Sequence, residues 1–234
     1  MSNIYTDIES IPGQDPAIEQ DIRADIAEEC MSLKHPRSYT KKESIHAWYE
    51  SEREKLFASF DDRYLKCSLD GGRGEICAIS FAVDDSPVFG GNTESFSERE
   101  LLCLFWRDLV ANIKELRKDE KEEHVWIGHN VRNFDLPFLY KRSVILGIKP
   151  PIDVPFSSGP SDKRVFDTMT AWAGWGKYIS QDALCRLLGL PVKEGMTGAD
   201  VYQYWQDGKY SEILEYNKRD VETVRKIHKR MTFA

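Results

Sequence analysis

The sequence predicts an α/β fold in which a mixed sheet is flanked by helices, and two observations support this class. Short apolar segments with strand character lie at residues 4–8 and 75–83, before most of the predicted helices. Two further short strands, 125–127 and 164–166, are each followed by a segment with helical spacing. Strands that come first and then alternate with helices are typical of a mixed sheet with helices on its faces.

The remaining segments are assigned in chain order. Residues 10–73 are polar, rich in charge and interrupted by prolines, and only 44–60 has helical spacing there. We treat 10–73 as a helical or irregular elaboration of a single domain spanning 1–234, because it is short and poor in strand signals. It could serve as a clamp over a substrate, as a docking surface or as cover for the sheet. Further helices are predicted at 97–116, 134–146, 180–188 and 211–231. The charged run at 114–123 is most simply a solvated helix end.

Composition excludes several classes of protein. With 41% apolar residues the chain is not mostly disordered, and it has no apolar run long enough to cross a membrane. The N-terminus lacks a basic segment followed by an apolar one, so no secretory signal is expected. The five scattered cysteines are expected to be reduced and mostly buried, in a cytoplasmic protein. A net charge of −7 argues against coating of a duplex, but not against an enzyme that holds a nucleic-acid end through metal ions.

The first acidic pair lies on the first predicted strand. Asp7 and Glu9 are two residues apart, so both side chains point to the same face of the strand, while Ile8 points to the other. Two carboxylates about 7 Å apart repel each other unless positive charge lies between them. A divalent metal would satisfy this arrangement. The alternative is a pair of solvated acids on an edge strand.

A third acid follows the strand at 125–127. Asn133 is placed to cap the next helix, and Asp135 lies in its first turn, where the helix N-terminus stabilises an ionised carboxylate. Acids are common in first helical turns, so capping alone explains Asp135 as well as metal binding does.

The fourth acid lies in an apolar stripe of the last helix. Tyr216 and Asp220 are four residues apart and share a face with Ile213, Val224 and Ile227. A carboxylate among apolar side chains is costly unless it is paired or ligates a metal. Asp220 is therefore the most informative single residue in the sequence.

Three motifs built around these acids occur in order along the chain: D-x-E at 7–9, N-x-x-x-F-D at 130–135 and Y-x-x-x-D at 216–220. Together they resemble the motifs of the DEDD 3′–5′ exonucleases. The tyrosine branch (DEDDy) is indicated, because Glu stands at position 215, where the histidine branch would carry His. The stretch from Asp167 through 180–184 to 196–200 resembles the exonuclease domain of family B DNA polymerases and its stand-alone relatives. The resemblance covers most of the chain and is weakest over 13–70.

This resemblance implies an RNase H-like five-stranded mixed sheet and two divalent cations, Mg²⁺ or Mn²⁺, held by four acids. Carried over residue by residue, Asp7 would bridge both metals, and Glu9 and Asp220 would hold the metal that binds the attacking water. Asp135 would hold the second metal. Tyr216 would orient the nucleophile, since a phenol of pKa near 10 is a poor base at neutral pH.

The implied activity is metal-dependent 3′–5′ hydrolysis that releases nucleoside 5′-monophosphates from single-stranded DNA, which is favoured over RNA. The alternatives are an exoribonuclease of the same superfamily, a non-catalytic module that binds nucleic acid or protein, and a structural α/β protein with chance motifs. Replication or repair proteins are the expected protein partners, and no membrane partner is expected.

Three residues beside the acids are candidates for contact with the terminal nucleotide: Ile8, Asn130 and Phe134. Ile8 and Phe134 would wedge or stack the terminal base, with core packing as the alternative. Asn130 would bond the sugar or backbone, or fix its own turn. Basic pairs at 141–142, 163–164 and 218–219 would reach phosphates, although surface charge is the simpler interpretation. His129 is expected to be structural rather than a general base. Three tryptophans are expected to pack in the core or locally rather than to form a base-binding platform: Trp172, Trp175 and Trp205.

Overall fold

The computed structural model describes residues 2–116, 123–192 and 195–234. The chain divides into two compact units, Met1–Ile11 with Ile76–Ala234 and Pro12–Glu75. The smaller unit agrees within two residues with the elaboration predicted at 10–73. That the two units form one exonuclease domain stays a prediction. Most of the charged run at 114–123 lies outside the described residues.

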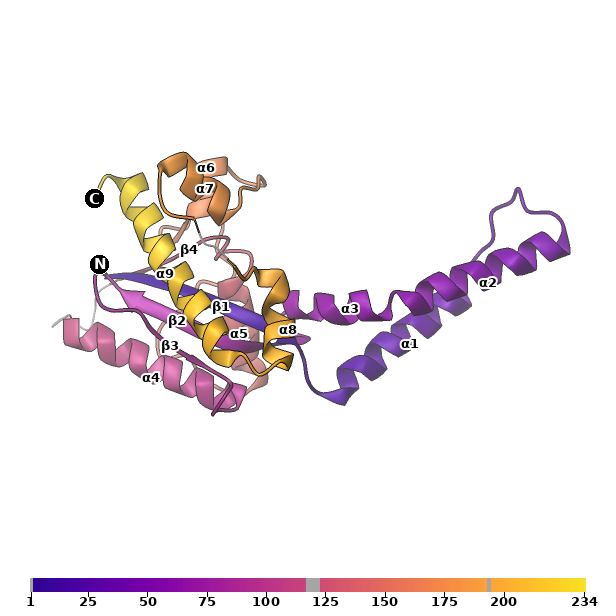
Figure 1. Ribbon diagram of the computed structural model, residues 1–234, viewed down its shortest axis with the longest axis horizontal. Helices are drawn as coiled ribbons and strands as arrows, with labels where there is room; N and C mark the ends of the chain where they lie inside the picture. The colour runs from indigo at the N-terminus through magenta and orange to yellow at the C-terminus, as the bar shows by residue number, and fades with distance from the viewer. Residues whose placement is uncertain (1, 117–122, 193–194) are drawn as a thin grey trace. The chain divides into compact units, whose positions relative to one another are not determined.

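The larger unit is built on a five-stranded sheet in the order β3-β2-β1-β4-β5 (Figure 1). Its strands are β1 (Ser2–Pro12), β2 (Gly74–Val83), β3 (Phe89–Asn92), β4 (His124–Gly128) and β5 (Val165–Asp167). β1 pairs with β4, and β4 with β5, in parallel, whereas β2 and β3 are antiparallel. Bonds from Asp84 N to Asn3 O and from Cys77 Sγ to Glu9 O show that β2 also runs antiparallel to β1. The predicted mixed sheet is therefore confirmed.

Helices cover both faces of this sheet. They are α4 (Glu98–Leu116), α5 (Asp135–Ile145), α6 (Thr168–Ala173), α7 (Gln181–Leu188), α8 (Val201–Gln206) and α9 (Tyr210–Thr232). The main core packs α4 and α5 against Ile4, Ile8 and Ile79 of the sheet. On the opposite face, Tyr5 and Ile11 of β1 pack in clusters that include α9.

The alternation of β1 decides where its acids point. Ile4 and Ile8 face α4 and α5, so the odd-numbered side chains of the strand face α9. Asp7 and Glu9 therefore lie on the face covered by the helix that carries Asp220. The period of a strand and the amphipathic pattern of α9 thus bring the first and last acids of the chain together.

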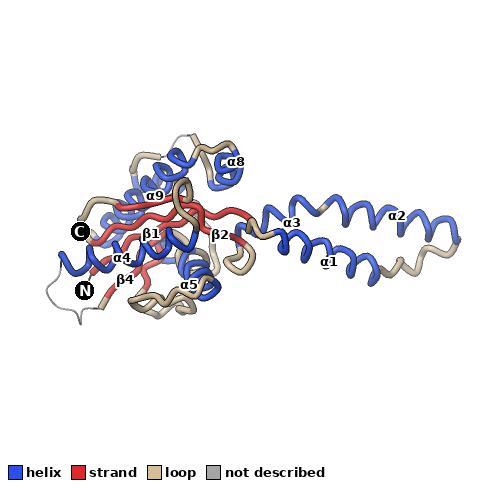
Figure 2. Tube along the Cα trace, turned by 90° about the horizontal axis from the view of Figure 1, so that it is seen from below, coloured by secondary structure: helices blue, strands red, loops and turns tan. Residues whose placement is uncertain are grey.

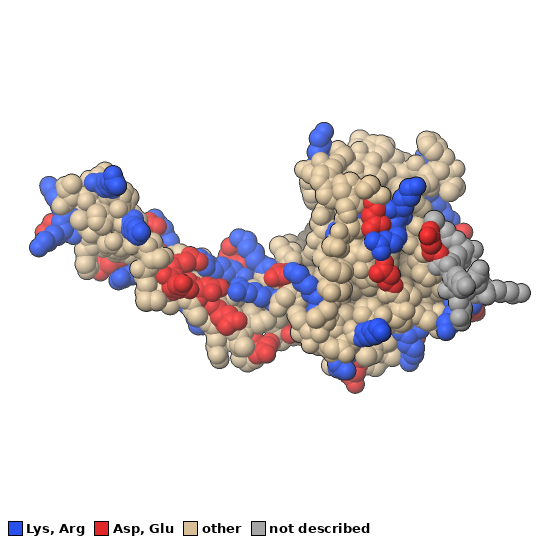
Figure 3. Space-filling view, turned by 180° about the vertical axis from the view of Figure 1, so that it is seen from behind, with Lys and Arg blue, Asp and Glu red and all other residues tan. Residues whose placement is uncertain are grey.

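The smaller unit consists of α1 (Pro16–Ser32), α2 (Lys42–Ala58), α3 (Phe60–Lys66) and a 3₁₀ turn at Cys67–Leu69. Figure 2 shows α1 and α2 side by side. Ile22, Ile26 and Cys67 form a small core, and α1 was not predicted because only two residues along it are buried. Figure 3 shows acidic and basic side chains interspersed on these helices, with ion pairs such as Arg63–Glu29.

Two expectations about the chain as a whole concern its helices and its cysteines. Among the described residues, no helix combines the length and the apolar character needed to span a bilayer. The cysteines are free thiols, and Cys67, Cys77 and Cys185 are buried as predicted. Cys103 is exposed and Cys30 is half-buried.

Candidate active site

Three of the four predicted acids meet between β1 and α9. Asp7, Glu9 and Asp220 each offer a carboxylate oxygen, and these oxygens all lie within 4.8 Å of one another. Glu9 and Asp220 are 7% and 5% exposed, and Asp7 is half-buried. Three carboxylates so close together and so poorly hydrated repel one another strongly. The cluster therefore needs compensating positive charge or hydrogen-bond donors.

One such donor is Asn217, which the sequence analysis did not single out. Its Nδ2 donates a hydrogen bond of 2.7 Å to Asp7 Oδ2, and the side chain is fully buried. Asn217 follows Tyr216 and precedes Asp220 by one helical turn, so all three share the face of α9 that meets β1. The signal that could have found Asn217 is a polar residue next to Tyr216 and one turn before Asp220, which hydropathy alone does not single out.

Tyr216 stands beside the acids with its hydroxyl protonated. Burial, followed by the charges of Glu9 and Asp7, raises the pKa of Tyr216 above its ordinary value. The ring packs against Ile11 and Ile213, and 9% of the residue is exposed. At neutral pH its phenol is therefore a hydrogen-bond donor that faces the carboxylates.

Asp135 lies next to this group and is held differently. It is the first residue of α5, is 3% exposed, and its Oδ1 accepts a hydrogen bond of 3.1 Å from the Ile8 N–H. Burial and then the charge of Asp7 raise the pKa of Asp135 well above its usual range. Its oxygens are not part of the group that lies within 4.8 Å. The predicted cap was wrong: Phe134 occupies the N-cap position without a side-chain bond, and Asn133 Nδ2 instead donates to Asn130 Oδ1.

A buried carboxylate shapes the turn between β4 and α5. Asp167 accepts hydrogen bonds from the backbone N–H of Asn130 and Arg132, and it also caps α6. Asn130 adopts a φ of +64°, a conformation that asparagine tolerates better than most residues. Phe134, which follows this turn, is half-buried. The centroid of its ring lies 5.6 Å from that of Phe138.

Comparison with known proteins assigns the chain to a family. Residues 75–233 match the family described as "Predicted 3'-5' exonuclease related to the exonuclease domain of PolB". The chain belongs to this family. The matched residues include this chain's motifs at 130–135 and 216–220, and they leave out β1 with Asp7 and Glu9.

Individual relatives of the family cover shorter stretches. The DNA polymerase delta catalytic subunit of Arabidopsis thaliana is 38% identical over 65 residues, which is 27% of this chain. A DNA polymerase of Thermococcus litoralis is 30% identical over 114 residues, or 43% of this chain. The chain spans only 5% and 6% of the length of these two proteins.

A solved structure supports the fold. The family B DNA polymerase of the archaeon Pyrobaculum calidifontis superimposes with a TM-score of 0.54 at 16% identity, over 96% of this chain and 23% of that polymerase. The predicted RNase H-like fold, a five-stranded mixed sheet flanked by helices, is therefore confirmed.

For this family member, the acidic cluster fits divalent cations by its chemistry. Asp7, Glu9 and Asp220 supply hard carboxylate oxygens, the ligands that Mg²⁺ and Mn²⁺ prefer. The amide of Asn217 orients one of these carboxylates, as outer-shell partners commonly do in metal sites. The residues present thus fit the metal ions that the resemblance implies.

The remaining site candidates fall into two groups. Asn130 and Phe134 lie in the turn beside Asp135 and stay predicted substrate contacts. The side chain of Ile8 is 3% exposed and packs in the main core, so the core-packing alternative describes it, and its backbone N–H supports Asp135.

One residue of each basic pair forms an ion pair within the protein. Arg142 forms a buried ion pair with Glu98, and Arg164 pairs with Asp162. Lys218 pairs with Glu215 on the exposed side of α9. Surface charge, the simpler interpretation, fits the exposed Arg164 but was wrong for Arg142, which is buried.

The histidine and tryptophans behave differently from one another. His129 is structural as predicted: its Nδ1 lies 2.9 Å from Thr168 Oγ1 and its Nε2 lies 2.9 Å from the Ile179 carbonyl oxygen. Trp205 packs locally, and its Nε1 donates to Thr93 Oγ1. Trp172 and Trp175 are 46% and 54% exposed, so a place in the core was wrong for both, and local packing stays a prediction.

Proposed function

We propose that this chain is a divalent-metal-dependent 3′–5′ exonuclease that removes nucleoside 5′-monophosphates from the 3′ end of single-stranded DNA. The main support for the proposal is that carboxylate oxygens of Asp7, Glu9 and Asp220 lie within 4.8 Å of one another. They do so in a chain that belongs to a predicted exonuclease family. A non-catalytic module would have little reason to keep three repelling acids in a poorly hydrated site.

In the proposed reaction, a water oxygen bonds to the terminal phosphorus and the bond from phosphorus to the 3′ oxygen of the neighbouring nucleotide breaks. That 3′ oxygen gains a proton, so the products are a nucleoside 5′-monophosphate and a shortened strand. Two divalent cations, when bound, would activate the water and stabilise the charge on the leaving oxygen. We assign Asp7, Glu9 and Asp220 to hold the cations, together with Asp135.

The other residues position the reactants. Tyr216, protonated at neutral pH, donates a hydrogen bond to the attacking water and cannot serve as its base unaided. Phe134 stacks on the terminal base, and Asn130 bonds its sugar or the backbone. Asn217 keeps Asp7 in one orientation through the bond from its amide. We also propose that residues 1–234 act as one exonuclease domain, in which 12–75 is the elaboration.

The test uses 5′-labelled and 3′-labelled single-stranded oligonucleotides of DNA and of RNA, with Mg²⁺, with Mn²⁺ and with EDTA. We expect metal-dependent release of mononucleotides from the 3′ end of the DNA. Replacing Asp7 by Ala should abolish release and leave the fold intact. The control variant Glu212→Gln changes an exposed acid on α9, the helix that carries Asp220, and should cleave like the parent.

Each other outcome has a definite meaning. Faster cleavage of RNA would favour the exoribonuclease alternative. Binding without cleavage by the parent would favour a non-catalytic module. Cleavage by Asp7→Ala at the parent rate would show that the assigned site is wrong.

A further inference from the structure

Two exposed aromatic side chains of the larger unit, Trp175 and Tyr178, line one hollow. The hollow measures about 320 Å³, and Asn133, Met169, Thr170 and Lys177 also line it. Trp175 is 54% exposed and Tyr178 is 80% exposed. Large aromatic groups left this open to water mark a binding surface more often than a folding requirement.

The backbone holds Trp175 in this position. It stands between Gly174 and Gly176, whose φ values of +89° and +73° lie in the region that glycine adopts without strain. The Lys177 N–H donates to the Gly174 carbonyl oxygen at 3.2 Å and closes the turn. No atom of the described residues lies within 4 Å of a Cβ built on either glycine, so these glycines serve the turn geometry rather than close packing.

The turn is joined to the candidate active site at both sides. On one side, Asn133 lines the hollow and bonds to Asn130, which we place on the terminal nucleotide. On the other side, His129 at the end of β4 bonds the Ile179 carbonyl, and Gln181 Nε2 donates to the Asp220 carbonyl oxygen at 3.3 Å. Hydrogen bonds therefore connect the neighbourhood of the turn at 174–177 to the segments that carry Asp135 and Asp220.

We infer that this hollow binds a base of the single strand on the 5′ side of the scissile bond, by stacking on Trp175 and Tyr178. The inference rests on the proposed function. Base stacking on aromatic side chains tolerates every sequence, as an exonuclease that degrades a strand stepwise requires. Lys177, exposed on the rim, supplies a cation for a neighbouring phosphate. Phe134 would still stack on the terminal base, as in the proposed function.

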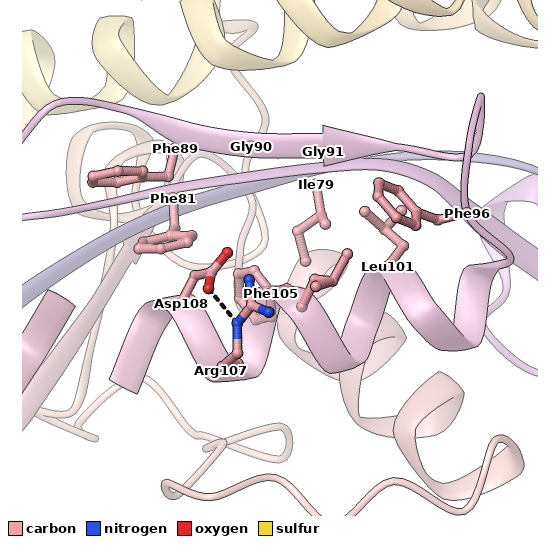
Figure 4. A pocket seen from close by; sticks show the side chains of 11 residues that line it. Ile79, Phe81, Phe89, Gly90, Gly91, Phe96, Leu101, Phe105, Arg107 and Asp108 are labelled. Carbon is pink, nitrogen blue, oxygen red and sulfur yellow. Dashed lines mark hydrogen bonds and ion pairs between the residues drawn. The ribbon is translucent and has the colours of Figure 1, made fainter. Parts of the chain in front are cut away.

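Another hollow provides the matched control. It measures about 290 Å³ and lies between β2, β3 and α4, where Phe81, Phe89 and Phe96 surround it (Figure 4). Its charged residues, Arg107 and Asp108, pair with each other. None of its lining residues belongs to the acidic cluster, so Phe96, which is 44% exposed, serves as an exposed aromatic outside the site.

The binding experiment uses the full chain with Asp7→Ala to prevent cleavage, and fluorescence anisotropy of a 5′-labelled oligothymidylate. Trp175→Ala and Tyr178→Ala should each weaken binding by roughly tenfold, the range expected for the loss of one stacked base. Trp175→Phe should restore most of the affinity, because it keeps an aromatic face. Phe96→Ala should bind like the parent. Unchanged affinity in both alanine variants would overturn the inference, and it is the result expected if this hollow docks a protein instead.

A kinetic experiment separates this inference from the proposed function. The thymidine 5′-monophosphate p-nitrophenyl ester carries one nucleotide, so it has no second base to place in the hollow. With Asp7 intact, Trp175→Ala should raise KM for the oligothymidylate about tenfold more than KM for the ester. If the parent hydrolyses neither compound, the proposed function fails, and the anisotropy experiment still decides the base-binding hollow. If the parent hydrolyses both compounds and Trp175→Ala raises the two KM values equally, the inference that the hollow binds a base is wrong, and the proposed function stands.

Discussion

The amide Nδ2 of Asn217 lies 2.7 Å from Oδ2 of Asp7, and this bond joins the last helix of the chain to its first strand. The bond is between residues 210 positions apart, so no local pattern specifies it. Asn217 is fully buried, and its Oδ1 finds no hydrogen-bond partner among the described residues. Burying an amide oxygen without a hydrogen-bond partner costs free energy, so we infer that the amide is retained because its Nδ2 positions the carboxylate of Asp7.

Replacing Asn217 by Leu, which has a similar shape, removes the donor that bonds Asp7 Oδ2. We expect the Mg²⁺ concentration for half-maximal cleavage to rise roughly 10- to 100-fold, as is usual when an outer-shell partner of a metal ligand is lost. Saturating Mg²⁺ should recover most of the rate. The measurement is a Mg²⁺ titration of initial rates, with Glu215→Gln as the exposed control. An unchanged titration curve would remove Asn217 from the site.

Metal binding should stabilise the fold, because bound cations relieve the repulsion among Asp7, Glu9 and Asp220. At about 100 times the dissociation constant, Mn²⁺ should add about 2.7 kcal/mol, or roughly 5–10 °C in the Tm of a chain of this size. EDTA should reverse the gain, and Asp7→Ala should show little of it. An equal rise in Tm for Asp7→Ala would place the metal elsewhere.

Tyr216→Phe tests whether the phenol orients the nucleophile. Because its raised pKa keeps the hydroxyl protonated, we expect kcat to fall about 10- to 100-fold, less than the ~100- to 10,000-fold typical of a lost general acid or base. KM should change little, and the Tm should stay near that of the parent. A larger loss, accompanied by a shifted pH profile of kcat, would indicate that Tyr216 does transfer a proton.

A buried ion pair connects the two helices on the other face of the sheet. Arg142 Nε and Nη2 donate to Glu98 at 2.8 and 2.5 Å, and Glu98 also accepts from the Ile76 N–H at 2.8 Å. Glu98→Ala or Arg142→Ala should each lower the free energy of unfolding by about 3–5 kcal/mol, because each leaves a buried charge unpaired. The double variant should lose less than the sum. Asp108→Ala, which breaks an exposed pair, should cost at most about 1 kcal/mol. Denaturant unfolding measures all four.

His228 makes stability depend on pH. Burial and then the charge of Lys229 lower the pKa of His228 below 6.5, and its Nδ1 lies 3.0 Å from the Tyr5 hydroxyl. The folded state therefore binds a proton less readily than the unfolded state, so its stability is full above pH 6.5 and falls as the pH drops towards the lowered value.

The variant His228→Gln keeps a hydrogen-bond acceptor for Tyr5 and removes the titration. Between pH 7.5 and about pH 5.5, the free energy of unfolding should therefore fall less steeply in the variant than in the parent. Unfolding in urea at a series of pH values measures both slopes. Parallel curves would show that His228 titrates alike in the folded and unfolded states.

The strands and long helices were predictable because their signals are local. The alternation of β1, the apolar run of β2 and the spacing along α9 each lie within one segment, and each was found within a few residues of its bounds. Four helices were missed: α1 because it buries only two side chains, and α3, α6 and α8 because they have only seven, six and six residues.

The sequence by itself determined which acids share a face of an element: Asp7 with Glu9 on β1, and Asp220 with Tyr216 on α9. These relations follow from the periods of strand and helix, which depend only on spacing. Only the tertiary structure decided that β1 meets α9, that Asn217 bonds Asp7, that Ile8 is buried in the core, and that Trp175 stands in the open. Those facts depend on contacts between distant segments and on which side chains other elements cover. The spacing of residues along one segment gives no information about either.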